Sequence, residues 1–418
     1  MGSDAGFWAA YEGAAPAPAL LARMAPMPDP AAIPPREWLL GTRLVRRFVS
    51  LLVAPGGVGK SALALASAVS LASGRNILDE HVHHSVPAWM LNLEDPADEL
   101  HRRLAALMRL HRIEASELQE RLFMHHGRDR RLLLAEAVDG GVITHPDQDA
   151  LLQQVREQGI GLVVVDPFVK SHALNENDNM QMDRAVTAWA EVAEQSGAAV
   201  LLVHHVRKAG SGGPETGVDA ARGAKALSDA SRSATVLSPM TAAEAEQLGV
   251  SAAERWRHVR LDDAKANMAP RGSAARWFRM ETVVLGNGTA LYPNGDQVAA
   301  IGAWTPVSPW AAHAVKELNA VLDLLAEGPA RGARYTPSRR GGMSDRWGGR
   351  PLMLVLGVNE AQAATMLQTW LRSGVLEAIS YRDPDQRRER LGLHVVDGRR
   401  PGQLPKAITE EAGHDDAI

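Results

Sequence analysis

Short, continuous apolar segments alternate with longer helical patterns through the first half of the chain. The clearest apolar segments are residues 48–53, 87–93, 161–166 and 198–205. Helical patterns cover residues 62–72, 97–112 and 183–195. Continuous apolar strands that alternate with helices are typical of a parallel sheet covered on both faces. The pattern therefore predicts an α/β core with a mostly parallel sheet.

Shorter strand patterns follow from about residue 233. They cover residues 257–262, 276–281 and 282–285, and Gly286-Asn287-Gly288 then forms a turn signal. We expect these strands to extend the sheet of the core.

A second pattern of elements begins after a connector that contains Pro and Trp. We expect helices over 312–327 and 359–373, and a hairpin over 374–396 that turns at residues 382–385. Asn359 and Gln362 have the spacing of a capping box. If a short helix lies between Pro351 and Val358, this order suits a small winged-helix-like domain.

These patterns divide the chain into five parts. The predicted parts are a flexible Ala/Pro-rich arm over 1–35, an α/β core over 36–300, a linker over 301–311, a winged-helix-like domain over 312–396 and a disordered polar tail over 397–418.

Composition narrows the chemistry. The 418 residues include no cysteine, which excludes disulfides and thiolate chemistry and fits a reducing cytoplasm. The net charge of −4 gives no global basic field, so any contact with nucleic acid must be local. No apolar run reaches the roughly 18 residues that a membrane span needs. We therefore expect a cytoplasmic protein without a membrane partner.

A glycine-rich turn joins the first apolar strand to the first helix. It consists of Ala54, Pro55, Gly56, Gly57, Val58, Gly59, Lys60 and Ser61. A strand, a glycine-rich loop ending in Lys-Ser and a helix form the context of a phosphate-binding P-loop. The usual first glycine of the motif is replaced by Ala54, which is tolerable if its φ is negative. The alternative is a glycine-rich turn with a chance Lys-Ser pair.

The P-loop and the acidic residues at the ends of the other strands together offer the groups that nucleotide hydrolysis needs. Lys60 would contact the β- and γ-phosphates of ATP, and Ser61 would bind Mg²⁺. Asp166, which we expect one strand over from the P-loop, would hold the Mg²⁺ shell. Glu94 would deprotonate the attacking water, with Asp95 as the fallback base. The alternatives are an ordinary strand-end acid for Asp166 and a helix N-terminal acid for Glu94.

His204 and His205 close another strand, where they would sense the γ-phosphate. Metal binding or simple capping are the alternatives for this pair. Loops that follow the strand ends would contact DNA, or would be plain surface loops. The DNA-contact candidates are Lys170, His172, Arg207 and Lys208.

Three cations are candidates for an arginine-finger role on the γ-phosphate of another subunit. They are Arg222, Arg232 and Lys265. Each alone is better explained as a surface cation, but together with a P-loop we expect one of the three to be a finger that acts on another subunit.

In this order, the motifs resemble those of the RecA-like hexameric ATPases of the RepA replicative-helicase type, found on plasmids, and of their relatives in prophages and mobile elements. The matching blocks lie between about residues 40 and 290. They are 54–61, Leu93-Glu94-Asp95-Pro96 with Arg102-Arg103-Leu104, Val165-Asp166-Pro167-Phe168 with Glu176-Asn177-Asp178-Asn179, Val203-His204-His205, Ala221-Arg222-Gly223-Ala224, Arg232, Met240-Thr241-Ala242-Ala243-Glu244-Ala245-Glu246 and Lys265-Ala266-Asn267. Met268 departs from the family, which commonly has an aromatic residue there.

The resemblance implies a RecA-like P-loop NTPase core, a homo-hexameric ring, ATP bound between subunits and 5′→3′ unwinding of DNA. It also implies Lys60 and Ser61 on nucleotide and Mg²⁺, Asp166 on Mg²⁺, Glu94 as the base, the histidine pair as a sensor and Arg232 as the finger.

Two functions remain open from the sequence. The first is an ATP-driven helicase or translocase on single-stranded DNA, which serves replication of a plasmid or mobile element alongside a replication-initiation partner. The alternative is an ATPase switch without unwinding activity that binds DNA or a partner through the winged-helix-like domain and the Arg-rich loop 328–350. A small-molecule kinase is disfavoured by the placement of Glu94 and the histidine pair.

Overall fold

The structure is a computed structural model that describes residues 22, 24, 25, 27–127, 130–138, 143–206, 227, 231–268, 275–306, 313–330, 332–338, 344–384 and 387–402. Residues 1–37 form one compact unit and residues 38–418 form another. In the smaller unit, Asp29 caps a single 3-10 turn, η1 (Pro30–Ala32).

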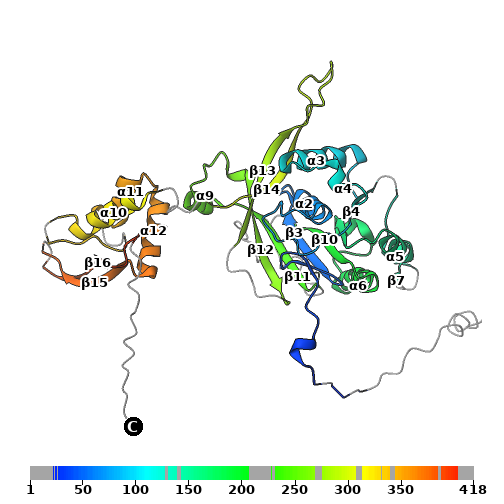
Figure 1. Ribbon diagram of the computed structural model, residues 1–418, viewed down its shortest axis with the longest axis horizontal. Helices are drawn as coiled ribbons and strands as arrows, with labels where there is room; N and C mark the ends of the chain where they lie inside the picture. The colour runs from blue at the N-terminus through cyan, green and yellow to red at the C-terminus, as the bar shows by residue number, and fades with distance from the viewer. Residues whose placement is uncertain are drawn as a thin grey trace, which may run out of the picture. The chain divides into compact units, whose positions relative to one another are not determined.

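A nine-stranded sheet organises the larger unit (Figure 1). Six neighbouring strands run parallel, which confirms the predicted parallel core. In spatial order they are β11 (Ser233–Pro239), β3 (Val49–Pro55), β10 (Ala199–Val206), β8 (Leu162–Asp166), β4 (Ala88–Asn92) and β5 (Leu122–His126).

Three antiparallel strands extend this sheet beyond β11, as expected. They are β12 (His258–Ala266), β13 (Arg276–Val284) and β14 (Gln297–Ala303). The two strands expected over 276–285 are one continuous strand, because β13 pairs along its length with β12 and then β14.

The strand order corrects one expectation. Asp166 does not lie one strand over from the P-loop strand, because β10 is inserted between β3 and β8 and pairs with both. The His204-His205 strand is therefore the direct neighbour of the P-loop strand. Periodicity predicts strands but does not specify where a crossover inserts them, so the order was not available from the pattern.

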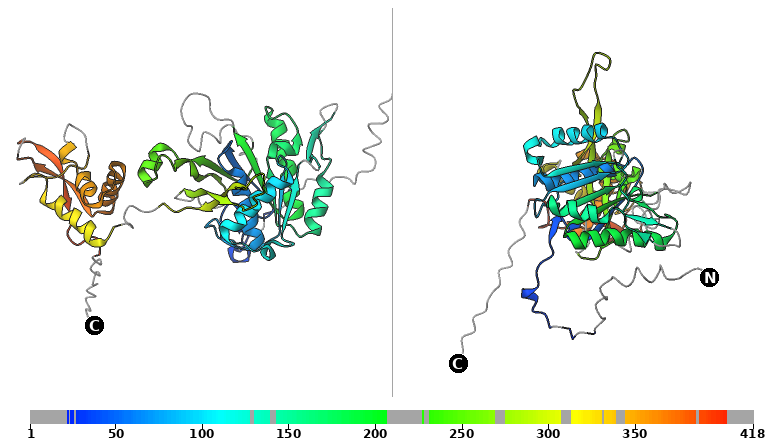
Figure 2. Two further views of the ribbon diagram at one scale, coloured as in Figure 1. Left: turned by 90° about the horizontal axis from the view of Figure 1, so that it is seen from above. Right: turned by 90° about the vertical axis from the view of Figure 1, so that its right-hand side faces the viewer.

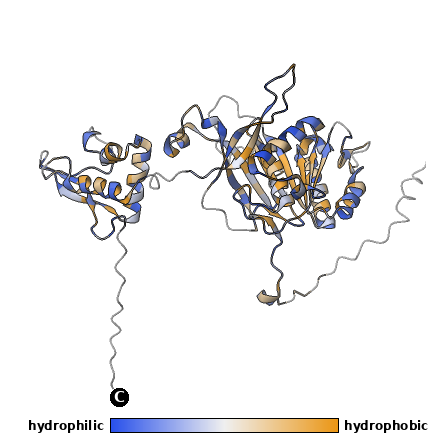
Figure 3. Cartoon of the chain, turned by 45° about the horizontal axis from the view of Figure 1, so that its top comes forward, coloured by the Kyte–Doolittle hydropathy of each residue, from blue (hydrophilic) through white to orange (hydrophobic). Residues whose placement is uncertain are grey.

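Helices cover both faces of the sheet, as the second panel of Figure 2 shows. One face packs against α2 (Lys60–Ser73), α3 (Ala97–His111) and α4 (Ala115–Leu118), and the other against α5 (Gln148–Glu157) and α6 (Asn179–Ser196). Alternate residues of each central strand join the two cores: Leu52 and Ala54 face one, and Leu51 and Val53 the other. Figure 3 shows these apolar strands between more polar helices.

Small elements surround the large sheet. Two short strands, β1 (Trp38–Leu40) and β2 (Leu44–Val45), pair with each other. A three-stranded sheet contains β7 (Ile143–Thr144), β6 (Ala135–Ala137) and β9 (His172–Ala173), and the turn η3 (Phe168–Ser171) precedes β9. Helix α9 (Ala242–Leu248) and the turn η4 (Arg255–Arg257) lie between β11 and β12 in the sequence.

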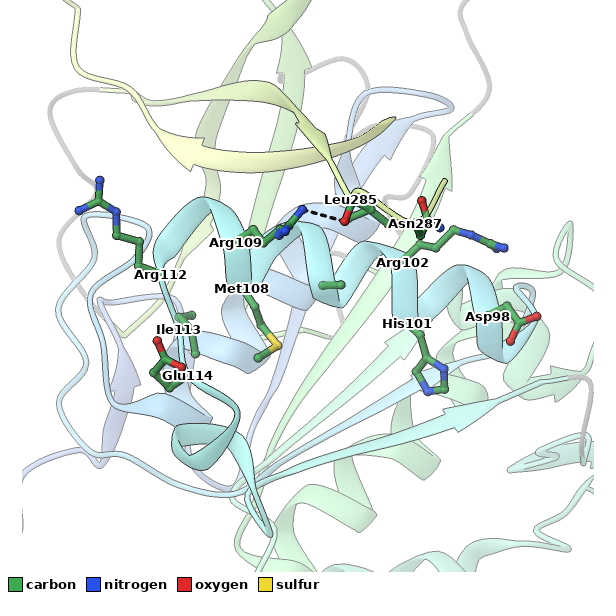
Figure 4. A pocket seen from close by; sticks show the side chains of 11 residues that line it. Asp98, His101, Arg102, Met108, Arg109, Arg112, Ile113, Glu114, Leu285 and Asn287 are labelled. Atoms are coloured by element: carbon green, nitrogen blue, oxygen red, sulfur yellow. Dashed lines mark hydrogen bonds between the residues drawn. The ribbon is translucent and has the colours of Figure 1, made fainter. Parts of the chain in front are cut away.

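Helix α3 is fastened to the end of the β13–β14 hairpin. The Arg109 guanidinium donates to the carbonyls of Val284 and Leu285 at 2.6 and 2.7 Å, and Figure 4 shows it reaching across from α3. Arg102 pairs with Asp296 at 2.9 Å. These contacts fix the helix that begins just after Glu94.

The C-terminal elements follow the predicted order, including the short middle helix. They are α10 (Val315–Glu327), η5 (Ser344–Arg346), α11 (Gly349–Leu356), α12 (Glu360–Ser373), β15 (Leu376–Arg382) and β16 (Glu389–Val395). These elements share a core that includes Leu322, Leu352 and Trp370. Their membership of the winged-helix class stays a prediction.

The described arginines of the 328–350 loop are engaged within this region. Arg334 donates to the Leu393 carbonyl at 3.2 Å, and Arg346 pairs at 2.8 Å with the fully buried Asp383. Arg350 pairs with Asp345. Arg331, Arg339 and Arg340 lie outside the described residues. In the described part of the chain, no helix is long and apolar enough to cross a bilayer.

Candidate nucleotide-binding site

The predicted P-loop occupies the carboxyl end of β3. The turn after Pro55 leads directly into α2, and Gly57 and Gly59 have φ values of 81° and 96°, which favour glycine. A Cβ built on Gly56 or Gly57 would have nothing within 4 Å, so the space beside the turn is open. Ala54 lies inside β3 without a positive φ, which meets the condition for replacing glycine.

Lys60, Ser61 and Asp166 form the polar floor of this space. Lys60 is 6% exposed; burial lowers its pKa, and the charges of Asp166 and Glu94 oppose that shift. Burial raises the pKa of Asp166, while a hydrogen bond from Ser61 and the charge of Lys60 act in the other direction. Asp166 therefore reaches Ser61, the second residue of α2, even though β10 separates β8 from the P-loop strand β3.

The donor set fits a magnesium ion. The Asp166 Oδ2 atom is buried and accepts no hydrogen bond from the described residues. A carboxylate oxygen and a hydroxyl oxygen beside an open phosphate site suit Mg²⁺, which prefers oxygen ligands and retains waters. The described residues include no cluster of three or more His, Asp or Glu side chains that would bind a metal by themselves.

The turn between β4 and α3 is hydrogen-bonded to the backbone of Asp166. Asn92 is 2% exposed, and its Oδ1 accepts the amides of Glu94 and Asp95 at 3.1 and 2.8 Å. The Leu93 amide donates to the Asp166 carbonyl at 2.8 Å. Asn92 therefore positions the turn that carries Glu94 and Asp95, and it was not identified from the sequence. A polar residue at the end of an apolar strand is the feature of the sequence that could have indicated it.

Glu94 and Asp95 have different surroundings. Asp95 accepts hydrogen bonds from Asn92 at 3.0 Å and from Arg103 at 2.7 Å. Glu94 is exposed, and its carboxylate accepts no hydrogen bond from the described residues. The geometry therefore favours Glu94 over Asp95 as the group free to contact a water.

The histidine pair lies on the strand beside the P-loop. His204 and His205 are in register with Val53 and Ala54 of β3. Burial, together with His205 and His172, lowers the pKa of His204 to about 4. Burial and the charge of Lys60 lower the pKa of His205, against the influence of Glu94. Both rings are therefore neutral hydrogen-bonding groups at pH 7.

Arg232 and Lys265 lie at the other end of the sheet. The Arg232 amide donates to the Val49 carbonyl at 3.3 Å, at the start of β3, and Ala234 is in register with Lys265. The P-loop turn begins about six residues further along β3, or roughly 20 Å away at the rise of a strand. An arginine side chain does not span that distance, so Arg232 is placed away from the phosphate site of its own chain.

The remaining predicted residues are the DNA-contact candidates and Arg222, of which the structure describes Lys170 and His172. Lys170 is exposed at the end of η3, and His172 is 5% exposed on β9. Arg207, Lys208 and Arg222 lie outside the described residues.

The comparisons with known proteins find a family model that matches and solved chains of partial likeness. Residues 19–211 match the model of a protein family described as an AAA domain, and this range contains the P-loop, Glu94, Asp166 and the histidine pair. Of 604 solved chains that match, one comes from a study of a DnaB-like replicative helicase and its interactions with primase. It is 14% identical, with a TM-score of 0.40, and the match covers 55% of this chain and 56% of that chain.

The match thus spans only a little over half of each chain, and a likeness this partial assigns no activity. The α/β fold, the P-loop geometry and the AAA-domain match together support an ATPase.

Proposed function

We propose that this protein is an ATP-driven motor on single-stranded DNA that works as a ring of identical subunits. The observation that carries the proposal is the separation of two sets of residues. Lys60, Ser61, Glu94, Asp166 and the histidine pair converge at the P-loop end of the sheet. Arg232 and Lys265 lie at the opposite end, away from the phosphate site of their own chain, and this supports a role on the nucleotide of a neighbouring subunit.

In this proposal the P-loop amides and Lys60 bind the phosphates of ATP, and Ser61 and Asp166 hold Mg²⁺. The bound ion would neutralise charge on the phosphates. Glu94 would accept the proton of the attacking water, and Asn92 would hold Glu94 in position. The histidine pair would detect the loss of the γ-phosphate, because His205 lies between the P-loop and Asp166 in the sheet.

Arg232 of one subunit would reach the γ-phosphate bound by the next, with Arg222 and Lys265 as the other candidates. The loops after Asp166 and His205 would then pass movement to DNA. Lys170, His172, Arg207 and Lys208 remain the proposed DNA contacts. A hexameric ring, a role in replication of a plasmid or mobile element, and a replication-initiation partner belong to the same proposal.

The second candidate is an ATPase switch without unwinding activity. This function would use the Arg-rich loop to contact DNA, and its three described arginines, Arg334, Arg346 and Arg350, are engaged within the C-terminal region instead.

The test is strand displacement of a forked DNA by the full chain with ATP, alongside ATP hydrolysis with and without single-stranded DNA. The motor predicts stimulated hydrolysis, displacement and a ring-sized species with a non-hydrolysable ATP analogue. An ATP hydrolysis rate that single-stranded DNA does not change, together with no strand displacement, would support the switch.

A further inference from the structure

A cavity of about 530 Å³ lies beside the turn that carries Glu94. Its walls come from the segments that follow three neighbouring parallel strands. Leu93 follows β4, Gly127 and Arg131 follow β5, and Lys170 and His172 follow β8. Ligands of parallel sheets bind beyond the carboxyl ends of the strands, so the place itself suits a binding site.

Two cations face this cavity. The side chains of Arg131 and Lys170 are exposed, and neither is paired with a carboxylate of the described chain. One carboxylate, Glu176, also lines the cavity, so the residues that line it carry a net positive charge. A guanidinium and an ammonium together are the side chains that proteins use for phosphate groups.

A buried donor completes the set. The Nδ1 atom of His172 accepts the Leu174 amide at 3.3 Å, so in the neutral ring the proton is on Nε2. Burial lowers the pKa of His172 to about 4, which keeps the ring neutral at pH 7. Its Nε2 is buried and has no acceptor among the described residues. A buried donor without an acceptor is unfavourable, and a ligand oxygen would satisfy it.

We propose that this cavity is a second phosphate-binding site, separate from the P-loop, in which Arg131, Lys170 and the His172 Nε2–H hold a phosphate group of a nucleotide-sized ligand. Its volume is in the range of small-molecule pockets and exceeds the needs of a single inorganic ion. Glu176 is placed to accept a hydrogen bond from the base or sugar of the ligand. The phosphate belongs either to a strand of DNA or to a free nucleotide, and the experiment below distinguishes them.

The cavity also touches the turn that positions Glu94. The Gly127 amide donates to the Asn92 carbonyl at 2.7 Å, and a Cβ on Gly127 would lie 2.4 Å from the Leu93 backbone. On the other side, the Phe168 ring lies 4.9 Å from the His172 ring and 6.4 Å from the His204 ring. If the proposed ATPase function holds, a ligand here would alter the rate of hydrolysis through both contacts.

The test measures binding without ATP, so it does not depend on hydrolysis. Fluorescence anisotropy of a labelled oligothymidine and calorimetry with thymidine monophosphate form its two arms, both on the full chain. Arg131→Glu and Lys170→Glu change exposed side chains, and Lys316→Glu and Arg372→Glu are matched controls on α10 and α12. Circular dichroism confirms that each variant is folded.

We expect Arg131→Glu and Lys170→Glu each to raise Kd about tenfold or more in one arm, and the controls to stay within about twofold. His172→Phe should weaken binding of the same ligand.

An effect on oligonucleotide binding alone identifies the phosphate of a strand, and an effect on monophosphate binding identifies a free nucleotide. Unchanged binding in both arms, or equal losses in the controls, would overturn the site. Binding that persists in a chain without ATPase activity would refute the proposed function and leave this site standing.

Discussion

Two neighbouring carboxylates follow β4, and the protein holds them differently. Asp95 is fixed by Asn92 and Arg103, whereas Glu94 lies close enough to the P-loop for its charge to act on Lys60. Glu94→Gln should therefore retain ATP binding and lower kcat by about 10² to 10⁴, the range of a lost general base. Asp95→Asn should lower kcat less, because its carboxylate supports the turn. Single-turnover hydrolysis and nucleotide binding check both variants; normal turnover by Glu94→Gln would move the base to Asp95.

The buried ring of His172 makes stability depend on pH. The folded ring has a pKa of about 4 against the ordinary value of 6.5, so unfolding takes up a proton between these values. The free energy of unfolding should therefore fall as pH drops from 6.5 towards 4, by up to about 3 kcal/mol from this ring.

His172→Phe should flatten that part of the pH dependence. Urea unfolding at pH 7 and pH 5 measures it, with His394→Phe on the exposed face of β16 as the control. An identical loss of stability in His172→Phe and the unaltered chain would contradict the assignment.

At the scale of elements, a buried ion network joins four segments of the core. Glu80 pairs with Arg43 at 2.7 Å and with Arg276 of β13, and Arg43 also donates to Ser67 of α2 at 2.8 Å. Burial alone would raise the pKa of Glu80, but both arginines outweigh it, so its pKa lies below the ordinary value. The network holds α2, whose first turn carries Lys60, against β13.

Glu80→Gln should cost about 3 to 5 kcal/mol of stability, because it leaves Arg43 buried without its counter-charge. Chemical denaturation measures the loss, and Glu377→Gln on β15 is the exposed control. A change within about 0.5 kcal/mol, as for an ordinary surface substitution, would contradict a supporting role for the network.

The elements also show how far the sequence determines the fold. Apolar runs predicted β3, β4, β8 and β10, because each is buried on both faces. Periodicity does not determine where a helix begins, because side-chain caps do. Helix α6 begins at Asn179 because the Asp178 side chain accepts the amides of Met180 and Gln181. Helix α5 and the β7–β6–β9 sheet were not predicted.

Tertiary contacts account for what the sequence could not supply at the site. The motif pattern placed Lys60, Glu94, Asp166 and the histidine pair together at one sheet edge. It could not show that Gly127 packs on the Leu93 backbone, because those residues meet only through the pairing of β4 with β5. The strand order and the position of Arg232 likewise depend on pairings between distant segments.

At the scale of the whole molecule, the P-loop and Arg232 lie at opposite ends of the sheet, and we therefore expect Arg232 of one subunit to act on the nucleotide of the next. Arg232→Ala and Lys60→Ala should each be inactive alone, yet a mixture should regain part of the activity. In a mixed ring, some interfaces pair an intact P-loop with an intact Arg232. Steady-state hydrolysis across mixing ratios measures this, with each variant alone as the control. A mixture that never exceeds its components would exclude Arg232 as a group that acts on a neighbour.

ATP hydrolysis at the P-loop underlies both candidate functions of this chain, and the steady-state ATPase rate of the purified chain beside Lys60→Ala tests it. We expect magnesium-dependent hydrolysis by the unaltered chain and its near-complete loss in Lys60→Ala, which should remain folded. An unaltered chain without hydrolysis in the presence of single-stranded DNA, or Lys60→Ala at the full rate, would contradict it.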